Sequence, residues 1–130
     1  MIASHRKRHR ATLALLSALL SACGTSEPCT LIGCESGLIV RVSGLPDGEA
    51  TIALQVAGQE PVIRKCQSTA TCELPGVQFT DQTPASATIL VTSGDFSKSF
   101  VVTDLDYEDH RPNGPGCPPV CRTAVVTFSA

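Results

Sequence analysis

Apolar and polar residues alternate with period two along much of the chain after residue 37, which is the pattern of half-buried β-strands. The clearest runs lie at residues 37–43, 51–57, 86–92, 96–103 and 122–128, with weaker segments at 61–66 and 71–74. The residues expected to face the core in the clear runs are Leu38, Val40 and Val42; Ile52, Leu54 and Val56; Ile89 and Val91; Phe96, Phe100 and Val102; and Ala124, Val126 and Phe128. Residues 75–84 and 104–119 interrupt the pattern and are predicted to be loops.

About seven short strands separated by turns predict an all-β fold, namely an antiparallel β-sandwich that is Ig-like in its broad architecture. A small β-barrel is the alternative. The chain has no Trp, so it lacks the Cys-Trp-Cys core of true immunoglobulin domains. No segment after residue 23 shows a sustained helical period of 3.6 residues, and no long helix is expected.

The N-terminus has a different pattern. A basic segment at residues 5–10 is followed by a Leu- and Ala-rich segment at 11–20 and by small residues, which is the layout of a secretory signal. An apolar run of about twelve residues is too short for a permanent transmembrane helix, which needs around twenty.

The end of this segment, Leu20-Ser21-Ala22-Cys23, resembles the lipobox of bacterial lipoproteins. In that family the Cys thiol receives a diacylglyceryl group, the signal is cut before the Cys, and the new amino terminus is acylated. The resemblance implies a signal peptide at residues 1–22 and lipid on Cys23. Together with the strand pattern, it divides the rest of the chain into a tether and N-terminal hook at 23–36 and a β-sandwich domain at 37–130. An ordinary signal peptidase site, with Cys23 left to form a disulfide, is the alternative.

The residue after the Cys also bears on localisation. Some lipoproteins of this family carry an Asp there that retains them in the inner membrane, whereas this chain has Gly24. The resemblance therefore implies an outer-membrane protein, facing either the periplasm or the cell exterior.

Six cysteines remain after Cys23, an even number that suits disulfides in an exported protein. They form three close pairs in the sequence: Cys29 and Cys34, Cys66 and Cys72, and Cys117 and Cys121. We predict a local Cys66–Cys72 bond. Because the first and last strands of a sandwich often lie side by side and parallel, we also predict Cys34–Cys121 and Cys29–Cys117, and the crossed pairing of these four stays open. A zinc site is disfavoured because no spacing is Cys-x2-Cys.

The net charge of the chain after Cys23 disfavours two classes of partner. The chain after Cys23 has six basic and twelve acidic residues, a net charge of −6. Such a surface repels nucleic acid and acidic lipid headgroups.

The chain also lacks a motif typical of a catalytic triad. After residue 23 the single histidine is His110, and no Gly-x-Ser-x-Gly motif accompanies it, so a Ser-His-Asp triad has no support. We predict a protein that is not an enzyme and needs no cofactor.

One acidic segment is a weak calcium candidate; it contains Asp104, Asp106, Glu108 and Asp109. An EF-hand loop starting at Asp104 would need Gly at its sixth position and an acidic residue at its twelfth. The chain has Asp109 and Pro115 there, so this is not an EF-hand, and a solvated acidic loop is the simpler interpretation.

The most distinctive segment is Pro112-Asn113-Gly114-Pro115-Gly116-Cys117-Pro118-Pro119-Val120-Cys121-Arg122. Together with the cysteines at 29 and 34, it resembles a group of uncharacterised cysteine-containing lipoproteins that share a Pro-Asn-Gly-Pro-x-Cys-x-Pro-Val-Cys-Arg element. That group has no known activity, so the resemblance implies none.

For function we predict a non-catalytic binding or structural module of the cell envelope, with an unidentified protein or envelope partner. Tyr107 and Arg111 are the candidate contact residues of the loop. For Tyr107 we favour slightly a structural role, as a corner residue whose hydroxyl bonds to backbone. The alternative function is a protease-inhibitor-like loop at residues 109–121 with Arg111 as its anchor, although Pro112 directly after the anchor suits a protease cleft poorly.

Overall fold

The computed structural model describes residues 28–130. The elements are β1 (Gly37–Ser43), β2 (Ala50–Gln55), β3 (Val62–Cys66), α1 (Thr69–Glu73), β4 (Val77–Thr80), β5 (Ala87–Ser93), β6 (Phe96–Val102), β7 (Glu108–His110) and β8 (Cys121–Ser129). The predicted signal peptide, the lipobox and Cys23 lie outside the described residues.

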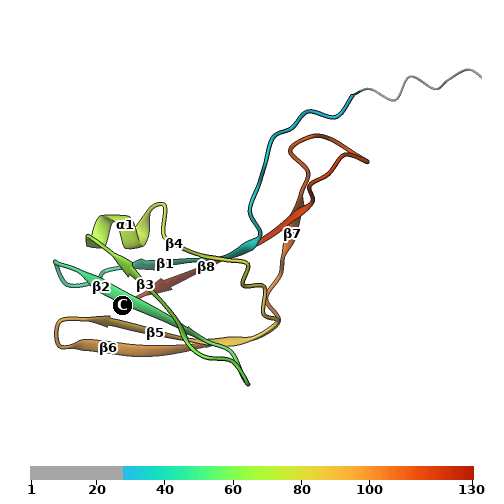
Figure 1. The fold of residues 1–130 in the computed structure, drawn as a ribbon. Helices are drawn as coiled ribbons and strands as arrows, with labels where there is room; N and C mark the ends of the chain where they lie inside the picture. Colours follow the sequence, from blue (N-terminus) through green and yellow to red (C-terminus); the bar gives the residue numbers. More distant parts are fainter. Residues whose placement is uncertain (1–27) are drawn as a thin grey trace, which may run out of the picture.

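The strands form two four-stranded sheets that pack on each other as a sandwich (Figure 1), in the orders β4-β1-β8-β7 and β3-β2-β5-β6. The predicted sandwich is therefore confirmed, and the sheets do not close into a barrel. In the first sheet β1 is antiparallel to β4 but parallel to β8, whose register runs from Gly37 opposite Thr123 to Ser43 opposite Ser129. The second sheet is antiparallel throughout.

The alternating pattern places one face of each central strand in the core. Leu38, Val40 and Val42 of β1 are buried, and Ile52, Leu54, Ile89 and Val91 face them from the other sheet. Of the predicted core positions on β6 and β8, Ala124 is buried and the others are partly buried. Phe100 of β6 stacks on Phe128 of β8 with ring centroids 4.2 Å apart. This aromatic pair is a contact between the two sheets.

The predicted strand at residues 71–74 is wrong, because this segment belongs to helix α1. Ser68 caps the helix: its side chain accepts a hydrogen bond from the Thr71 N–H, and the Thr71 hydroxyl accepts one from the Ser68 N–H. Cys66 and Cys72 therefore flank the start of a helix rather than a turn between adjacent strands.

Two strands lie in segments predicted to be loops. β4 begins directly after Gly76 and places Val77 and the fully buried Phe79 in the core. β7 pairs with β8 through residues 108–110 opposite 121–123. The structure thus has eight strands where about seven were expected. Within residues 28–130, no helix is long and apolar enough to cross a membrane.

Candidate functional site

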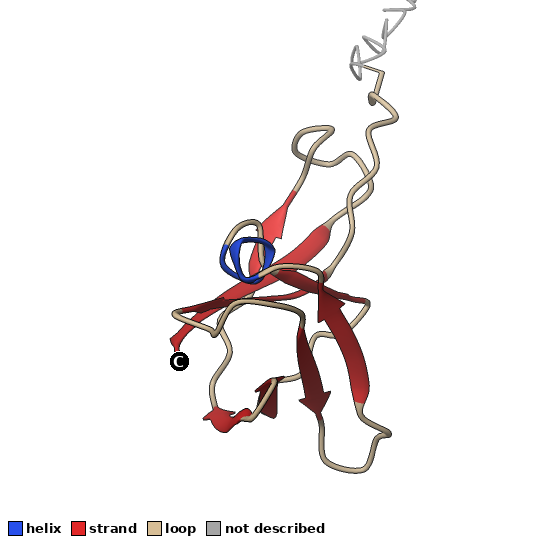
Figure 2. Ribbon diagram, turned by 90° about the vertical axis from the view of Figure 1, so that its left-hand side faces the viewer, coloured by secondary structure: helices blue, strands red, loops and turns tan. Residues whose placement is uncertain are grey.

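Two segments far apart in sequence leave the sandwich together as an arm (Figures 1 and 2). We define the arm as residues 28–34, before β1, and residues 112–120, between β7 and β8. The parallel pairing of β1 with β8 brings both segments to the same end of the first sheet. The arm is therefore a direct continuation of the β1–β8 pair.

Two disulfides close the arm. Cys34–Cys121 lies at its base, with a Cα–Cα distance of 6.0 Å, and Cys29–Cys117 lies farther out, at 5.6 Å. The third disulfide, Cys66–Cys72, links the end of β3 to α1 and is buried. All three predicted pairings are confirmed. Disulfides of this number are typical of proteins exported from the cytoplasm, so the domain is that of an exported protein.

Asn113 joins the two segments of the arm between these disulfides. Its Oδ1 accepts a hydrogen bond from the Ile32 N–H at 2.9 Å, and its Nδ2 donates to the carbonyls of Ile32 and Pro118, each at 2.8 Å. The Thr30 hydroxyl also donates to Oδ1. Nothing in the sequence pointed to Asn113, because Asn-Gly in a Pro-rich loop signals a turn and gives no sign of a distant partner.

Tyr107 lies at the base of the arm and has the geometry of a corner residue. Its hydroxyl donates to the Pro84 carbonyl at 2.8 Å, and the Arg122 guanidinium lies 5.6 Å from the centre of its ring. Burial raises the pKa of Tyr107 above its ordinary value, and the positive charge of Arg122 partly opposes this shift. The side chain thus bridges the loop before β5 and the strand β8.

The second predicted contact residue, Arg111, is exposed at the end of β7. The Gly114 N–H donates to the Arg111 carbonyl at 3.1 Å and closes a turn over residues 111–114. The structure therefore places Tyr107 and Arg111 on the same loop but in different environments. Their joint role as a contact site stays a prediction.

The acidic residues of the calcium candidate, Asp104, Asp106, Glu108 and Asp109, do not converge. Among residues 28–130, no three His, Cys, Asp or Glu side chains come together as a group that could hold a metal ion. Asp109 instead lies 3.4 Å from Arg122 across the β7–β8 pair, in an exposed ion pair. His110 is exposed on β7.

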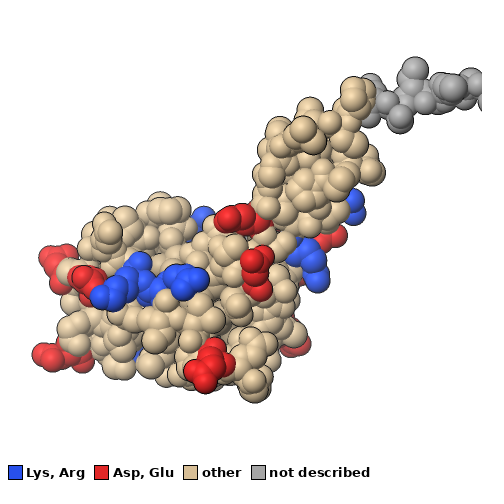
Figure 3. Space-filling model, in the orientation of Figure 1, with Lys and Arg blue, Asp and Glu red and all other residues tan. Residues whose placement is uncertain are grey.

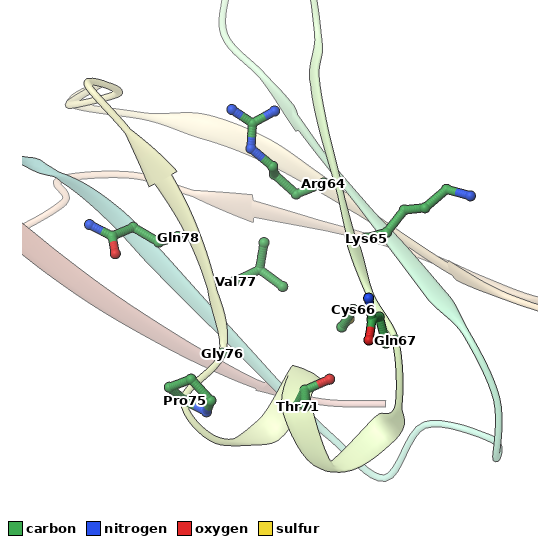
Figure 4. A pocket seen from close by; sticks show the side chains of 9 residues that line it. All are labelled: Arg64, Lys65, Cys66, Gln67, Thr71, Pro75, Gly76, Val77 and Gln78. Carbon is green, nitrogen blue, oxygen red and sulfur yellow. The ribbon is translucent and has the colours of Figure 1, made fainter.

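A groove of about 440 Å³ opens between the free edges of β3 and β4, with α1 at one end (Figure 4). Val77 and the Cys66–Cys72 disulfide lie at its inner side, and Gln67, Gln78 and Arg64 surround its mouth. Lys65 points away from the groove in this view and forms an exposed ion pair with Glu49 at 2.8 Å. The hydrogen bond that Lys65 donates to the Glu49 carboxylate lowers the pKa of Glu49 and raises the pKa of Lys65.

Charged side chains lie on the body of the molecule (Figure 3). Lys and Arg side chains form one group on the sandwich near β3 and another near the base of the arm, and acidic side chains are spread around the body. Neither residues 28–34 nor residues 112–120 contain any Lys, Arg, Asp or Glu. The outer part of the arm is accordingly free of charged side chains in this view.

Comparison of the chain with models of protein families, with curated proteins and with solved structures gave no significant match.

Proposed function

We propose that the chain is an outer-membrane lipoprotein of a bacterial cell envelope, anchored through lipid on Cys23, and that its β-sandwich is a non-catalytic binding or structural module. One observation carries the proposal. The six cysteines of residues 28–130 pair with one another, so the described part of the chain offers no thiol partner for Cys23. The residues before Cys23 resemble a lipobox, whose Cys is lipidated. Two or three acyl chains give a stable membrane anchor.

Metabolic labelling with a palmitate analogue tests the anchor. We expect label in the wild type and none in Cys23→Ala. The matched control is the pair Cys66→Ala and Cys72→Ala, which also removes thiols but keeps Cys23, and it should retain the label. An unlabelled wild type, or a labelled Cys23→Ala, would overturn the proposal.

Gly24 carries the assignment to the outer membrane. We expect wild-type protein in the outer-membrane fraction of a density gradient and Gly24→Asp in the inner-membrane fraction. Wild-type protein in the inner-membrane fraction would overturn the assignment.

The loop that carries Arg111 is the proposed contact surface for a protein or envelope partner. The disulfides and Asn113 hold this loop on a rigid scaffold, and Arg111 is exposed on it. A photo-crosslinking residue in place of Arg111 should give adducts in intact cells, whereas the same residue at the exposed Lys98 of β6 should give none. Absence of adducts at position 111, or equal adducts at both positions, would contradict this surface.

The inhibitor alternative gains no support from the geometry. A protease cleft binds its anchor residue in extended backbone, by strand-like pairing. The carbonyl of Arg111 instead accepts the hydrogen bond that closes a turn, and Pro112 follows directly.

A further inference from the structure

The arm exposes apolar side chains at the end of the molecule from which the N-terminal tether departs. Leu31 is 98% exposed, Ile32 56% and Val120 42%. The other large apolar side chains that are exposed among residues 28–130 lie on the body, on β3, β6, β8 and after α1. An uncharged arm that exposes several apolar side chains marks an interaction surface.

From these observations we propose that the arm docks on the lipid bilayer and inserts Leu31, Ile32 and Val120 at the boundary between headgroups and acyl chains. The inference deepens the proposed function and rests on it, because lipid on Cys23 is what brings the arm to the membrane.

The length of the tether argues for a bilayer rather than another partner. Six peptide steps separate Cys23 from Cys29, so even a fully extended tether reaches only about 20 Å. Cys29 lies in the outer disulfide of the arm, and the chain leaves the described structure at the far end of the arm from the sandwich (Figure 1). A lipidated Cys23 therefore holds the outer end of the arm, rather than the sandwich, next to the bilayer surface.

The charge distribution argues for the same orientation. Residues 28–130 carry six basic and eleven acidic residues, a net charge that an anionic membrane repels. The arm has no acidic residue to be repelled and no basic residue to bind anionic headgroups. Docking should therefore be hydrophobic and should not require anionic lipid.

Hydrogen bonds within the arm lower the cost of removing it from water. A loop that enters an apolar region loses the water bound to its backbone, and each unpaired N–H or carbonyl is costly there. At Ile32 both groups are already bonded to the Asn113 side chain. The residue can therefore present its apolar side chain to lipid without leaving its own backbone polar groups unpaired.

Because the chain has no Trp, single Trp substitutions report on the depth of each site. The full lipoprotein carrying Leu31→Trp is reconstituted in phosphatidylcholine and phosphatidylethanolamine vesicles with and without acyl-chain-brominated lipid. The matched control is Leu74→Trp, since Leu74 is 65% exposed beside α1, away from the arm. Palmitate labelling and flotation with the vesicles are measured on the same samples.

We expect the emission of Leu31→Trp to shift to the blue on reconstitution and to be quenched at least twofold by brominated lipid, with Leu74→Trp unchanged. In Val120→Trp, the added changes Leu31→Ser and Ile32→Ser should reduce the quenching. Labelled, floating protein without quenching at position 31 overturns the docking and leaves the anchor standing. A blue shift without quenching indicates burial against a second copy of the protein and also overturns the docking. Unlabelled protein that does not float overturns both proposals.

Discussion

Asn113 and Ile32 lie 81 positions apart in the sequence, and the Asn113 side-chain amide pairs with both backbone groups of Ile32, accepting at 2.9 Å and donating at 2.8 Å. This is the hydrogen-bonding pattern that a neighbouring strand would supply. A side-chain amide has one acceptor and two donors, and Asn113 uses its remaining donor on the Pro118 carbonyl. The amide therefore extends the β1–β8 pairing into a segment that is not strand.

Replacing Asn113 by Asp keeps the shape but removes both donors. The carboxylate would face the carbonyls of Ile32 and Pro118, so the two segments of the arm should separate between the disulfides. Each lost hydrogen bond costs about 0.5–1.5 kcal/mol. We expect hydrogen exchange of the Ile32 N–H to accelerate at least tenfold, while the global melting temperature falls by only a few degrees.

The Leu105 N–H provides an internal reference for that experiment, because it bonds to the Ala85 carbonyl outside the arm. Its exchange should be the same in wild type and Asn113→Asp. Unchanged exchange at Ile32, or equal acceleration at both amides, would contradict a local role for Asn113.

The two disulfides of the arm should stabilise the fold in a strongly non-additive way. Their sequence separations are 88 and 87 residues, and in the chain-entropy model the first to form contributes about 4.6 kcal/mol. Once one is present, the other closes a ring of only about nine residues and adds about 2.5 kcal/mol. Replacing either pair by Ala should therefore cost about 2.5 kcal/mol, and replacing both pairs about 7 kcal/mol.

Denaturant unfolding of the wild type, the two pair variants and the quadruple variant checks this expectation. The buried Cys66–Cys72 pair has a separation of 6 and provides the comparison, with an expected loss of about 2 kcal/mol. If the loss of stability in the quadruple variant equals the sum of the losses in the two pair variants, the second disulfide does not close a small ring within the first.

Gly76 should tolerate no side chain. It has φ +90°, and a Cβ there would lie 2.7 Å from the Val40 carbonyl oxygen in the neighbouring strand. Gly76→Ala should cost about 3 kcal/mol, from the left-handed backbone together with the clash. Gly94 has φ +56° with no atom within 4 Å of its Cβ position, so Gly94→Ala should cost only about 1 kcal/mol. Equal losses in thermal unfolding would exclude the clash as the cause.

The alternating runs allowed the sandwich to be predicted because burial on one face needs only period two. Leu38, Val40 and Val42 show this, as do Ile89 and Val91. Strand order favoured the two pairings of the arm, since Cys34 precedes β1 and Cys121 opens β8, but it left the crossed pairing of these four cysteines open. Both inferences use regularities that many sandwiches share.

The errors lie where a few residues or a distant partner decide the structure. Residues 69–73 form a helix because Ser68 and Thr71 cap each other, and so short a segment has no period to read. Strand β4 has only four residues, and only two of them, Val77 and Phe79, show the apolar alternation of a strand. The acidic residues of β7 show no such alternation, and they form a strand because they pair with β8. The pairing of Asn113 with Ile32 likewise depends on the fold.

Tyr107 connects the base of the arm to the sandwich, so its truncation should destabilise the whole domain. Tyr107→Phe loses the hydrogen bond to Pro84 and should cost about 1 kcal/mol. Tyr107→Ala also removes the ring from the partly buried cluster and should cost about 3 kcal/mol or more. Arg111→Ala, which changes an exposed residue of the same loop, should leave the free energy of unfolding within about 0.5 kcal/mol of wild type. A loss for Tyr107→Ala no larger than that for Arg111→Ala would argue against the corner role.

Alkaline pH should weaken the fold through the same residue. Burial raises the pKa of Tyr107 in the folded state, so the folded protein keeps its phenol proton at a pH where the unfolded chain has begun to lose it. This contribution to stability is complete below the unfolded pKa of about 10 and is lost as the pH rises from there through the raised folded value.

The chain has a single Tyr, so tyrosinate absorbance reports Tyr107 alone and should show its ionisation displaced above that of the unfolded chain. Tyr107→Phe should show a shallower loss of stability over the same pH range. Its remaining slope is expected from Lys65, whose pKa the hydrogen bond to Glu49 also raises; adding Lys65→Met should flatten the curve further. A Tyr107→Phe slope equal to that of wild type would mean that the phenol contributes nothing to the alkaline transition.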